Sequence, residues 1–260
     1  MNAAALALLI HSLAAASFSP YLPSVEAALE CVDESAFTPV DLNKVNFRYI
    51  PKCRFQMPVR AQTTLDMMRA PDEPRPYRHG THQGSDIYGL PYGEPVYPIA
   101  PGVVLRVDRA YVPMKTEYRQ KLLERCRETQ ATPGGEGAPE DPDYGDILDA
   151  LRGRQVWIYH GRNERGEAAV SIYAHLSAVG QIQPLQPVDA DTVIGHVGHS
   201  GTSHENKAEH WTPETHLHFE LYIGGRYWRP LRLGKKPSAE RIEAARRQVL
   251  LTFAPVRANP

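Results

Sequence analysis

The sequence lacks an excess of positive charge. Among its 260 residues, 29 are Lys or Arg and 30 are Asp or Glu, so the formal net charge is −1. The basic residues are interspersed with acidic ones and nowhere form a Lys/Arg block that could follow a phosphate backbone. We therefore expect no nucleic acid partner.

Long apolar runs are also scarce. Beyond the first residues, no stretch approaches the roughly 18 consecutive apolar residues that a membrane-spanning helix requires. Hydrophobic residues make up 42% of the chain and charged residues 23%, which is typical of a globular protein with a sizeable core. We expect no stable membrane span and, by default, a monomer.

The start of the chain is the exception to this scarcity of long apolar runs. Residues 1–18 are rich in Ala and Leu and end in small residues, which resembles a secretory signal with a cleavage point after Ala16. The alternative is a buried N-terminal helix. The signal interpretation predicts export to the periplasm or cell envelope.

Cysteine is rare, with Cys31, Cys53 and Cys126 as the full set. Their number is odd and their spacings match none of the short zinc-binding patterns, so they do not form the metal site. Cys31 and Cys53 could pair in an exported protein. Three separate thiols are the other interpretation.

The distribution of strand-forming residues predicts a mainly β, antiparallel sheet or sandwich. We divide the chain into a signal (1–18), an N-terminal extension (19–78), a main domain (79–233) and a C-terminal helical extension (234–260). Within the main domain, 111–154 has helical and Gly/Pro-rich segments and is expected to be an insertion too small for its own core. Strands are expected at 86–88, 95–99, 102–107, 156–160, 168–174, 192–197 and 216–223.

Two segments concentrate candidate metal ligands. In the first, His82 and Asp86 are four residues apart, a spacing that places both side chains on one side of an extended chain. In the second, 216–223, apolar residues alternate with His216, His218, Glu220 and Tyr222. Two adjacent imidazoles on one face of a strand indicate a metal or catalytic role, because a purely structural strand would have to provide partners for both.

Two histidines and one carboxylate match the three protein ligands of hydrolytic zinc. Such an ion lowers the pKa of its bound water and polarises the carbonyl that this water attacks. The chain has no His-Glu-x-x-His helix to supply a glutamate base. Histidines are therefore the candidate proton-transfer groups, namely His216 and, at the end of another strand, His175.

Five motifs follow one another along the chain: His82-x-Gly84-x-Asp86, Gly93-x-Pro95-Val96-Tyr97 with Pro101-Gly102-Val103-Val104, Tyr173-Ala174-His175-Leu176-Ser177, Ile194-Gly195-x-Val197-Gly198-x-Ser200-Gly201, and His216-Leu217-His218-Phe219-Glu220. In this order they resemble peptidase family M23, the lysostaphin-like and LytM-like metallopeptidases. The resemblance covers about residues 79–230 and is more specific than any one motif. Two departures are the 111–154 insertion and a long loop between Gly201 and His216, both expected to border the groove.

This resemblance implies a lysostaphin-like antiparallel β domain with Zn²⁺ held by His82, Asp86 and His218. It assigns the catalytic roles to His175 and His216, which would assist the attacking water and stabilise the tetrahedral intermediate. The implied activity is a zinc-dependent endopeptidase that hydrolyses peptide bonds in peptidoglycan cross-links or stem peptides by attack of a metal-bound water. The alternative is a non-catalytic LytM-like regulator that activates a separate cell-wall amidase.

Overall fold

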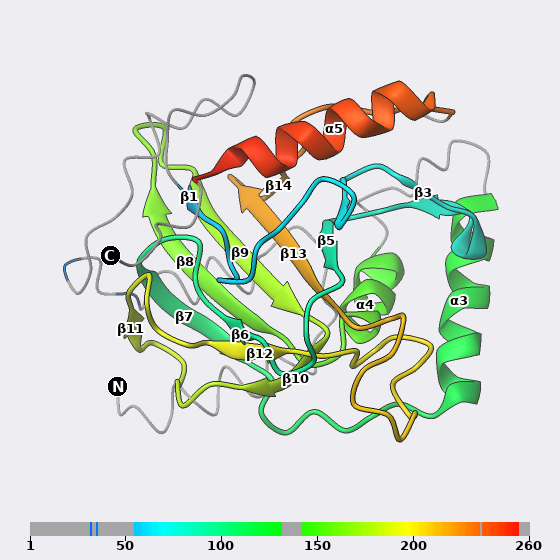
Figure 1. Cartoon of the computed structure of the whole chain (residues 1–260), viewed down its shortest axis with the longest axis horizontal. Coiled ribbons are helices and arrows are strands. Elements are labelled where there is room, and N and C mark those ends of the chain that lie inside the picture. The colour runs from blue at the N-terminus through cyan, green and yellow to red at the C-terminus, as the bar shows by residue number, and fades with distance from the viewer. Residues whose placement is uncertain (1–31, 33–34, 36–54, 132–141, 235, 255–260) are drawn as a thin grey trace.

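The eight-residue strand β13 (His216–Ile223) lies at the centre of the main sheet in this computed structural model (Figure 1). The structure describes residues 32, 35, 55–131, 142–234 and 236–254. Two sequence-based predictions lie outside these residues: the signal at 1–18 and the Cys31–Cys53 pair.

The main sheet has eight strands, and every pairing in it is antiparallel. Its order is β11-β7-β8-β9-β13-β5-β2, with β14 paired to β13. The bounds are β11 Pro187–Val188, β7 Gly102–Val107, β8 Val156–Arg162, β9 Ala168–Ala174, β5 Ser85–Tyr88, β2 Met68–Arg69 and β14 Arg226–Tyr227. The prediction of a mainly antiparallel β fold is confirmed.

Smaller sheets cover the edges. A three-stranded sheet consists of β10 (Leu176–Val179), β12 (Gly195–Val197) and β6 (Pro95–Val96). Two pairs complete the set: β1 (Phe55–Gln56) with β15 (Phe253–Ala254), and β3 (Pro74–Arg75) with β4 (Gly80–Thr81). A short 3-10 helix, η3 (Pro76–Arg78), joins β3 to β4.

Alternation along β13 places its residues on two different faces. Leu217, Phe219 and Leu221 pack into the principal hydrophobic core, as the period of two predicts for a strand. The opposite face carries His216, His218, Glu220 and Tyr222, which are also buried. Both faces of this strand are therefore covered, and the polar one requires partners for every buried group.

The C-terminal helix α5 (Ala239–Thr252) crosses above the sheet in Figure 1. Ser238 caps it by accepting a hydrogen bond from the Arg241 backbone N–H. Ala245 and Val249 are buried in the principal core. None of the helices in the described ranges is both long enough and apolar enough to cross a membrane.

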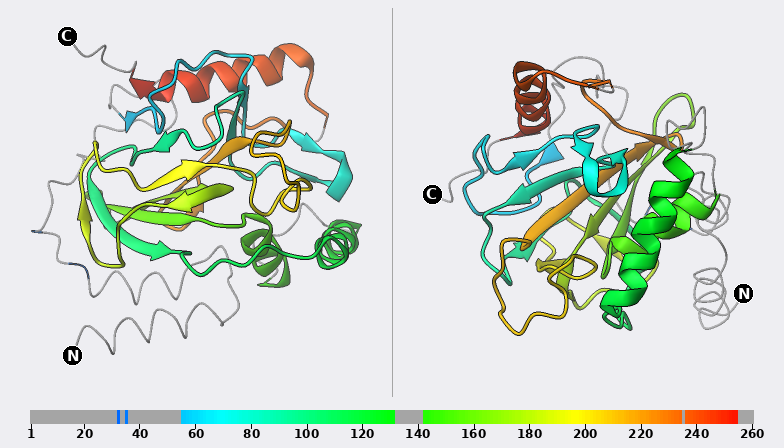
Figure 2. Two further views of the ribbon diagram at one scale, coloured as in Figure 1. Left: turned by 60° about the horizontal axis from the view of Figure 1, so that its bottom comes forward. Right: turned by 90° about the vertical axis from the view of Figure 1, so that its right-hand side faces the viewer.

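The 111–154 segment contains helices α3 (Thr116–Ala131) and α4 (Pro142–Leu151). Figure 2 shows the two lying side by side at one end of the sheet. They share a small apolar cluster made by Leu122, Leu123, Cys126, Ile147, Leu148 and Leu151. The expectation that this segment is too small to form an apolar core of its own is therefore wrong, because two amphipathic helices packed together bury one.

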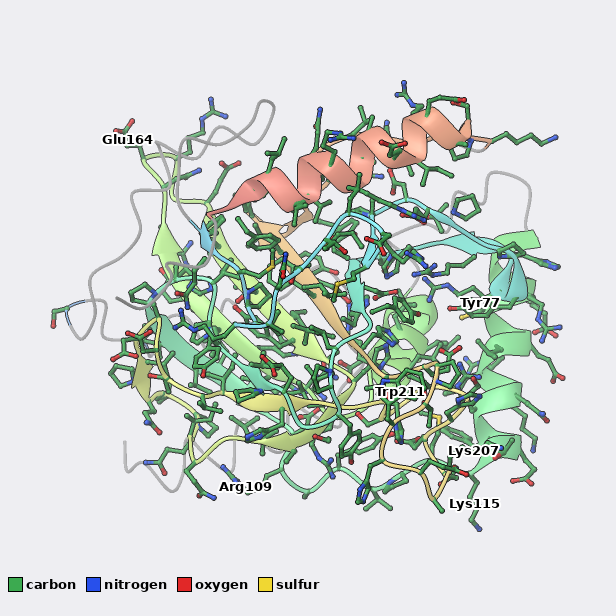
Figure 3. All side chains as sticks on the ribbon, viewed as in Figure 1. Tyr77, Arg109, Lys115, Glu164, Lys207 and Trp211 are labelled. Carbon is green, nitrogen blue, oxygen red and sulfur yellow. The ribbon has the colours of Figure 1, made fainter. Side chains whose placement is uncertain are left out.

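Residues 55–78 are also part of the folded unit. Their strand β2 pairs with β5 in the main sheet, and Phe55, Met57 and Val59 are buried in the principal core. This segment brings η3 against α3, where Tyr77 is exposed (Figure 3).

Candidate metal centre

Strand register brings the two ligand-bearing segments together. His218 on β13 lies directly opposite Asp86 on β5, and His216 lies opposite Tyr88. Directly opposed residues of an antiparallel pair have Cβ atoms about 5 Å apart on the same face. The pairing therefore places one imidazole beside one carboxylate, although 132 residues separate them in the chain.

His82 completes the cluster from the segment before β5. Its Nε2 lies 3.0 Å from Asp86 Oδ1 and 3.3 Å from His218 Nδ1, and His218 Nδ1 lies 2.7 Å from Asp86 Oδ1. Donor atoms of all three residues lie within 4.8 Å of one another. Around a tetrahedral zinc with bonds of 2.0–2.1 Å, ligand atoms are about 3.3 Å apart, so the three atoms are close to the spacing that one ion requires.

Gly84 makes this approach feasible. It has φ +135°, and a Cβ on it would lie 2.2 Å from Cε1 and 2.6 Å from Nε2 of His218. The ring of His218 therefore occupies the space that any larger residue would need. The presence of glycine at position 84 of the His82-x-Gly84-x-Asp86 motif therefore has a direct steric explanation.

The outer nitrogen of each ligand histidine is held by an acceptor. His82 Nδ1 donates to the Ala70 carbonyl at 3.1 Å, and His218 Nε2 lies 2.8 Å from Glu220 Oε1. Such bonds fix the tautomer that leaves the other nitrogen free for a metal. Both rings thus present the correct nitrogen to the shared point.

The two carboxylates that contact the ligand histidines, Glu220 and Asp86, are themselves paired with arginines. Glu220 forms a two-bond pair with Arg152, at 2.6 and 2.8 Å, and accepts from the Tyr222 hydroxyl at 2.8 Å. Asp86 Oδ2 pairs with Arg75 at 2.6 Å. All carboxylate oxygens of the cluster therefore have partners, as groups this deeply buried require.

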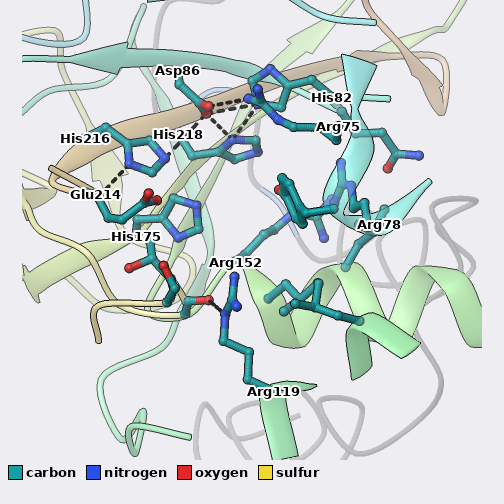
Figure 4. A pocket seen from close by; sticks show the side chains of 18 of the residues that line it. Arg75, Arg78, His82, Asp86, Arg119, Arg152, His175, Glu214, His216 and His218 are labelled. Atoms are coloured by element: carbon teal, nitrogen blue, oxygen red, sulfur yellow. Dashed lines mark hydrogen bonds and ion pairs between the residues drawn. The ribbon is translucent and has the colours of Figure 1, made fainter. Parts of the chain in front are cut away.

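The two remaining candidate histidines lie next to the cluster (Figure 4). His216 Nε2 is 3.6 Å from Asp86 Oδ1, and its Nδ1 donates to the Glu214 carbonyl at 2.7 Å. His175 donates from Nδ1 to the Ser200 carbonyl at 2.7 Å, and its ring centroid lies 4.6 Å from that of His216. In each ring Nδ1 is occupied, which leaves Nε2 available for proton transfer.

His175 occupies an unusual backbone position. It separates β9 from β10 with φ +59°, in the left-handed region that non-glycine residues rarely adopt and that costs about 1–3 kcal/mol. Its backbone N–H is held by the Arg152 carbonyl at 2.9 Å. Strained positions that are held in this way cluster at functional sites.

Burial and hydrogen bonding set the protonation of the cluster in the ion-free protein. Burial lowers the pKa of His82 to about 4 despite the neighbouring Asp86, and burial also lowers the pKa values of His216 and His175. Burial alone would raise the pKa of Asp86, but the adjacent histidines and their hydrogen bonds hold it well below its usual range. Neutral imidazole and ionised carboxylate are the forms that bind metals.

Among the four histidines of the cluster and its surroundings, His82, His175, His216 and His218, only His218 has the opposite shift. Burial lowers its pKa, but its hydrogen bonds to Asp86 and Glu220 outweigh that effect and raise it above the ordinary value. A metal would compete with this proton for Nδ1.

A cavity of about 360 Å³ adjoins the cluster. Its lining includes Arg119 and Leu123 of α3, Leu148 and Leu151 of α4, and Gly201, Thr202 and Glu214 from the loop before β13. Both departures noted in the sequence therefore border this cavity, as expected. The sequence analysis missed Arg75, Arg78, Arg119 and Arg152, which also line it.

The fold and the site define a class: a mainly antiparallel β protein in which a buried His-Asp-His cluster adjoins a groove. Residues 144–230 match the model of peptidase family M23. This stretch contains His175, His216 and His218, and the resemblance of the chain to that family is thereby confirmed.

Several solved structures are similar to the chain. The catalytic domain of lysostaphin from Staphylococcus simulans is 18% identical with a TM-score of 0.33, over 60% of this chain and 77% of that one. A zinc-containing peptidase from Vibrio cholerae is 20% identical with a TM-score of 0.40, over 67% of this chain and 38% of that one. A variant of the catalytic domain of the prophage-encoded M23 protein EnpA from Enterococcus faecalis is 20% identical with a TM-score of 0.35, over 64% and 92%.

No curated protein matches the chain.

Proposed function

We propose that this protein is a zinc-dependent endopeptidase that hydrolyses peptide bonds in peptidoglycan cross-links or stem peptides. The observation that carries the proposal is the convergence of His82, Asp86 and His218 donor atoms within 4.8 Å, with His175 and His216 alongside. Three protein ligands are the number found in catalytic rather than structural zinc sites. The family resemblance supports peptidase chemistry, and peptidoglycan is the substrate class it implies.

Zn²⁺ fits the donor set, and the residues that would hold it are His82, Asp86 and His218. When bound, it would supply Lewis acidity for the scissile carbonyl and for a water molecule. His216 and His175 would accept and return protons through Nε2, because Nδ1 of each is already bonded to a backbone carbonyl. The proposal also places the protein outside the cytoplasm, in the periplasm or cell envelope, where peptidoglycan lies.

The test is a comparison of sacculi digestion with and without chelator. Purified zinc-loaded protein is expected to release peptides from sacculi, and chelation followed by zinc readdition should abolish and then restore the release. Release that persists after chelation contradicts the metal mechanism. A stoichiometrically zinc-loaded protein that releases nothing but stimulates a separate amidase would establish the regulator alternative instead.

Gly84→Ala is expected to weaken zinc binding by about 10- to 100-fold, the range seen when ligand orientation is disturbed. The added Cβ would collide with the His218 ring, which would have to move. Chelator competition measures the affinity. Gly93→Ala is the matched control, since Gly93 also has positive φ (+83°) but has no atom within 4 Å of an added Cβ; equal zinc affinity in both variants would contradict the steric argument.

Glu220→Gln is expected to reduce zinc affinity by about 10- to 100-fold, because the carboxylate that orients His218 is lost. It should also lower the free energy of unfolding by up to about 3–5 kcal/mol, since the buried charge of Arg152 then keeps only Asp149, at 3.7 Å, as a carboxylate neighbour. Urea denaturation and chelator competition measure the two effects. Asp108→Asn, which weakens the ion pair with Arg106 away from the cluster, should leave zinc affinity unchanged; a Glu220→Gln protein that binds zinc like the unaltered chain would refute the orienting role.

A further inference from the structure

The cavity that adjoins the metal centre, called the groove from here on, is lined by several arginines. Four arginines line it: Arg75, Arg78, Arg119 and Arg152. Figure 4 shows Arg78, Arg119 and Arg152 around the space, with Glu214, His175 and His216 on its left. The acidic residues of the lining are Asp86, Glu214 and Glu220.

Two of the four arginines are neutralised within the protein. Arg75 pairs with Asp86, and Arg152 pairs with Glu220 through two hydrogen bonds. These contacts assign them to the support of the metal ligands, and their charge is already compensated.

Arg78 and Arg119 have no such partner. Within the described ranges, neither has a carboxylate oxygen within the 4.0 Å of an ion pair. Arg78 is only 7% exposed, donates to the Thr81 carbonyl at 2.6 Å, and its Nε has no hydrogen-bond partner. Arg119 Nε donates to the Gly201 carbonyl at 3.1 Å.

Arg78 is buried with its Nε donor unsatisfied, and Arg119 is half-buried; the hydrogen bonds of both go to neutral carbonyls, while Glu214 and Glu205 act on Arg119 only through space. A guanidinium has five N–H donors and stays protonated in proteins. Burying its charge without a counter-ion is costly, and a carboxylate, which it can bind through two parallel bonds, offsets that cost. A ligand carboxylate in the groove would supply the counter-ion and the hydrogen-bond acceptors that these guanidinium groups lack within the described protein.

We propose that Arg78 and Arg119 bind a free carboxylate of the substrate peptide and thereby select acidic stem peptides over neutral glycine bridges. This rests on the proposed function, whose substrate class it narrows. Arg119 comes from the α3 helix of the inserted segment, and Arg78 from η3, which packs against that helix. The insertion is thus a specificity element.

Equilibrium binding of two matched probes tests the proposal. The probes are a directly cross-linked muropeptide dimer with free carboxyl groups and the same dimer with those groups amidated. The zinc-loaded full chain carries His175→Ala to suppress turnover. The free-acid dimer is expected to bind about 10- to 100-fold more tightly, the range for hydrogen bonds to charged groups.

Four further substitutions on that background localise the effect. Arg119→Gln and Arg78→Gln should each reduce the preference for the free acid at least about tenfold. Lys121→Gln, which removes an exposed charge from the same helix, should leave it intact. Arg119→Lys keeps the charge and should retain part of the preference, and thermal unfolding verifies that each variant is folded.

Equal affinity for the two dimers would overturn the proposal, as would an undiminished preference in folded Arg119→Gln. Because the readout is binding, it is separate from hydrolysis. A chain that prefers the free acid but cleaves neither dimer would refute the peptidase assignment alone. A chain that cleaves both dimers and binds them equally would refute only the carboxylate site.

Discussion

Replacing His82 with alanine is expected to remove zinc and to reduce peptidoglycan hydrolysis by more than about a thousandfold. His82 supplies one of only three ligand atoms, and its Nε2 lies 3.0 and 3.3 Å from the other two. Losing the ion removes several kcal/mol of transition-state stabilisation, and each 1.4 kcal/mol is about tenfold in rate. Metal analysis after dialysis and peptide release from sacculi measure the two effects.

His79→Ala is the matched control, because His79 is an exposed histidine only three residues away and is absent from the lining of the cavity. It should keep one zinc per chain and full activity. A His82→Ala protein that retains stoichiometric zinc and hydrolyses at the rate of the unaltered chain would rule out the proposed centre.

The second large effect concerns His175 and His216. Alanine at either position is expected to lower kcat by about 10²- to 10⁴-fold, the range for loss of a general acid or base. The zinc content should remain near one per chain, since neither side chain is among the three converging donors. Steady-state kinetics on a defined muropeptide, together with metal analysis, separate the loss of proton transfer from the loss of the ion.

His210→Ala serves as the comparison, since His210 is an exposed histidine of the long loop before β13 that stacks on Tyr92. Its kcat should match that of the unaltered chain. If His175→Ala and His216→Ala both turn over normally, the proton-transfer roles belong to other groups. If either loses zinc, its role is ligation instead.

Short runs of strand-forming residues made the central strands predictable, with clean alternation in 216–223. The predicted ranges 102–107, 168–174 and 216–223 coincide with β7, β9 and β13. By contrast, the strand predicted at 95–99 ends at Val96. Pro98 has no N–H to donate, Tyr97 donates to the Pro58 carbonyl, and Ile99 donates to the Tyr173 hydroxyl, so this backbone leaves the ladder.

Four of the five candidate site residues were visible in the sequence because they form two pairs at short spacings, whereas His175 was identified as a histidine at the end of a predicted strand. His82 and Asp86 are four apart, and His216 and His218 are two apart on one face of a strand. The structure places all five around one point, while their individual roles remain part of the proposal.

The arginines of the groove left no such local signal. Arg152 reaches Glu220 across 68 residues, and Arg119 reaches Gly201 across 82. Only tertiary packing of α3 and α4 against the end of the sheet creates these contacts. One hint was present, since Glu220 shares the histidine face of its strand and a buried carboxylate needs a positively charged partner.

X-ray absorption spectroscopy at the zinc edge of the purified protein tests the central claim most directly. The account predicts one ion per chain with a shell of nitrogen and oxygen atoms only, at about 2.0–2.2 Å, that includes two imidazoles and one carboxylate. A sulfur ligand at about 2.3 Å, or a spectrum unchanged by His218→Ala, would contradict it.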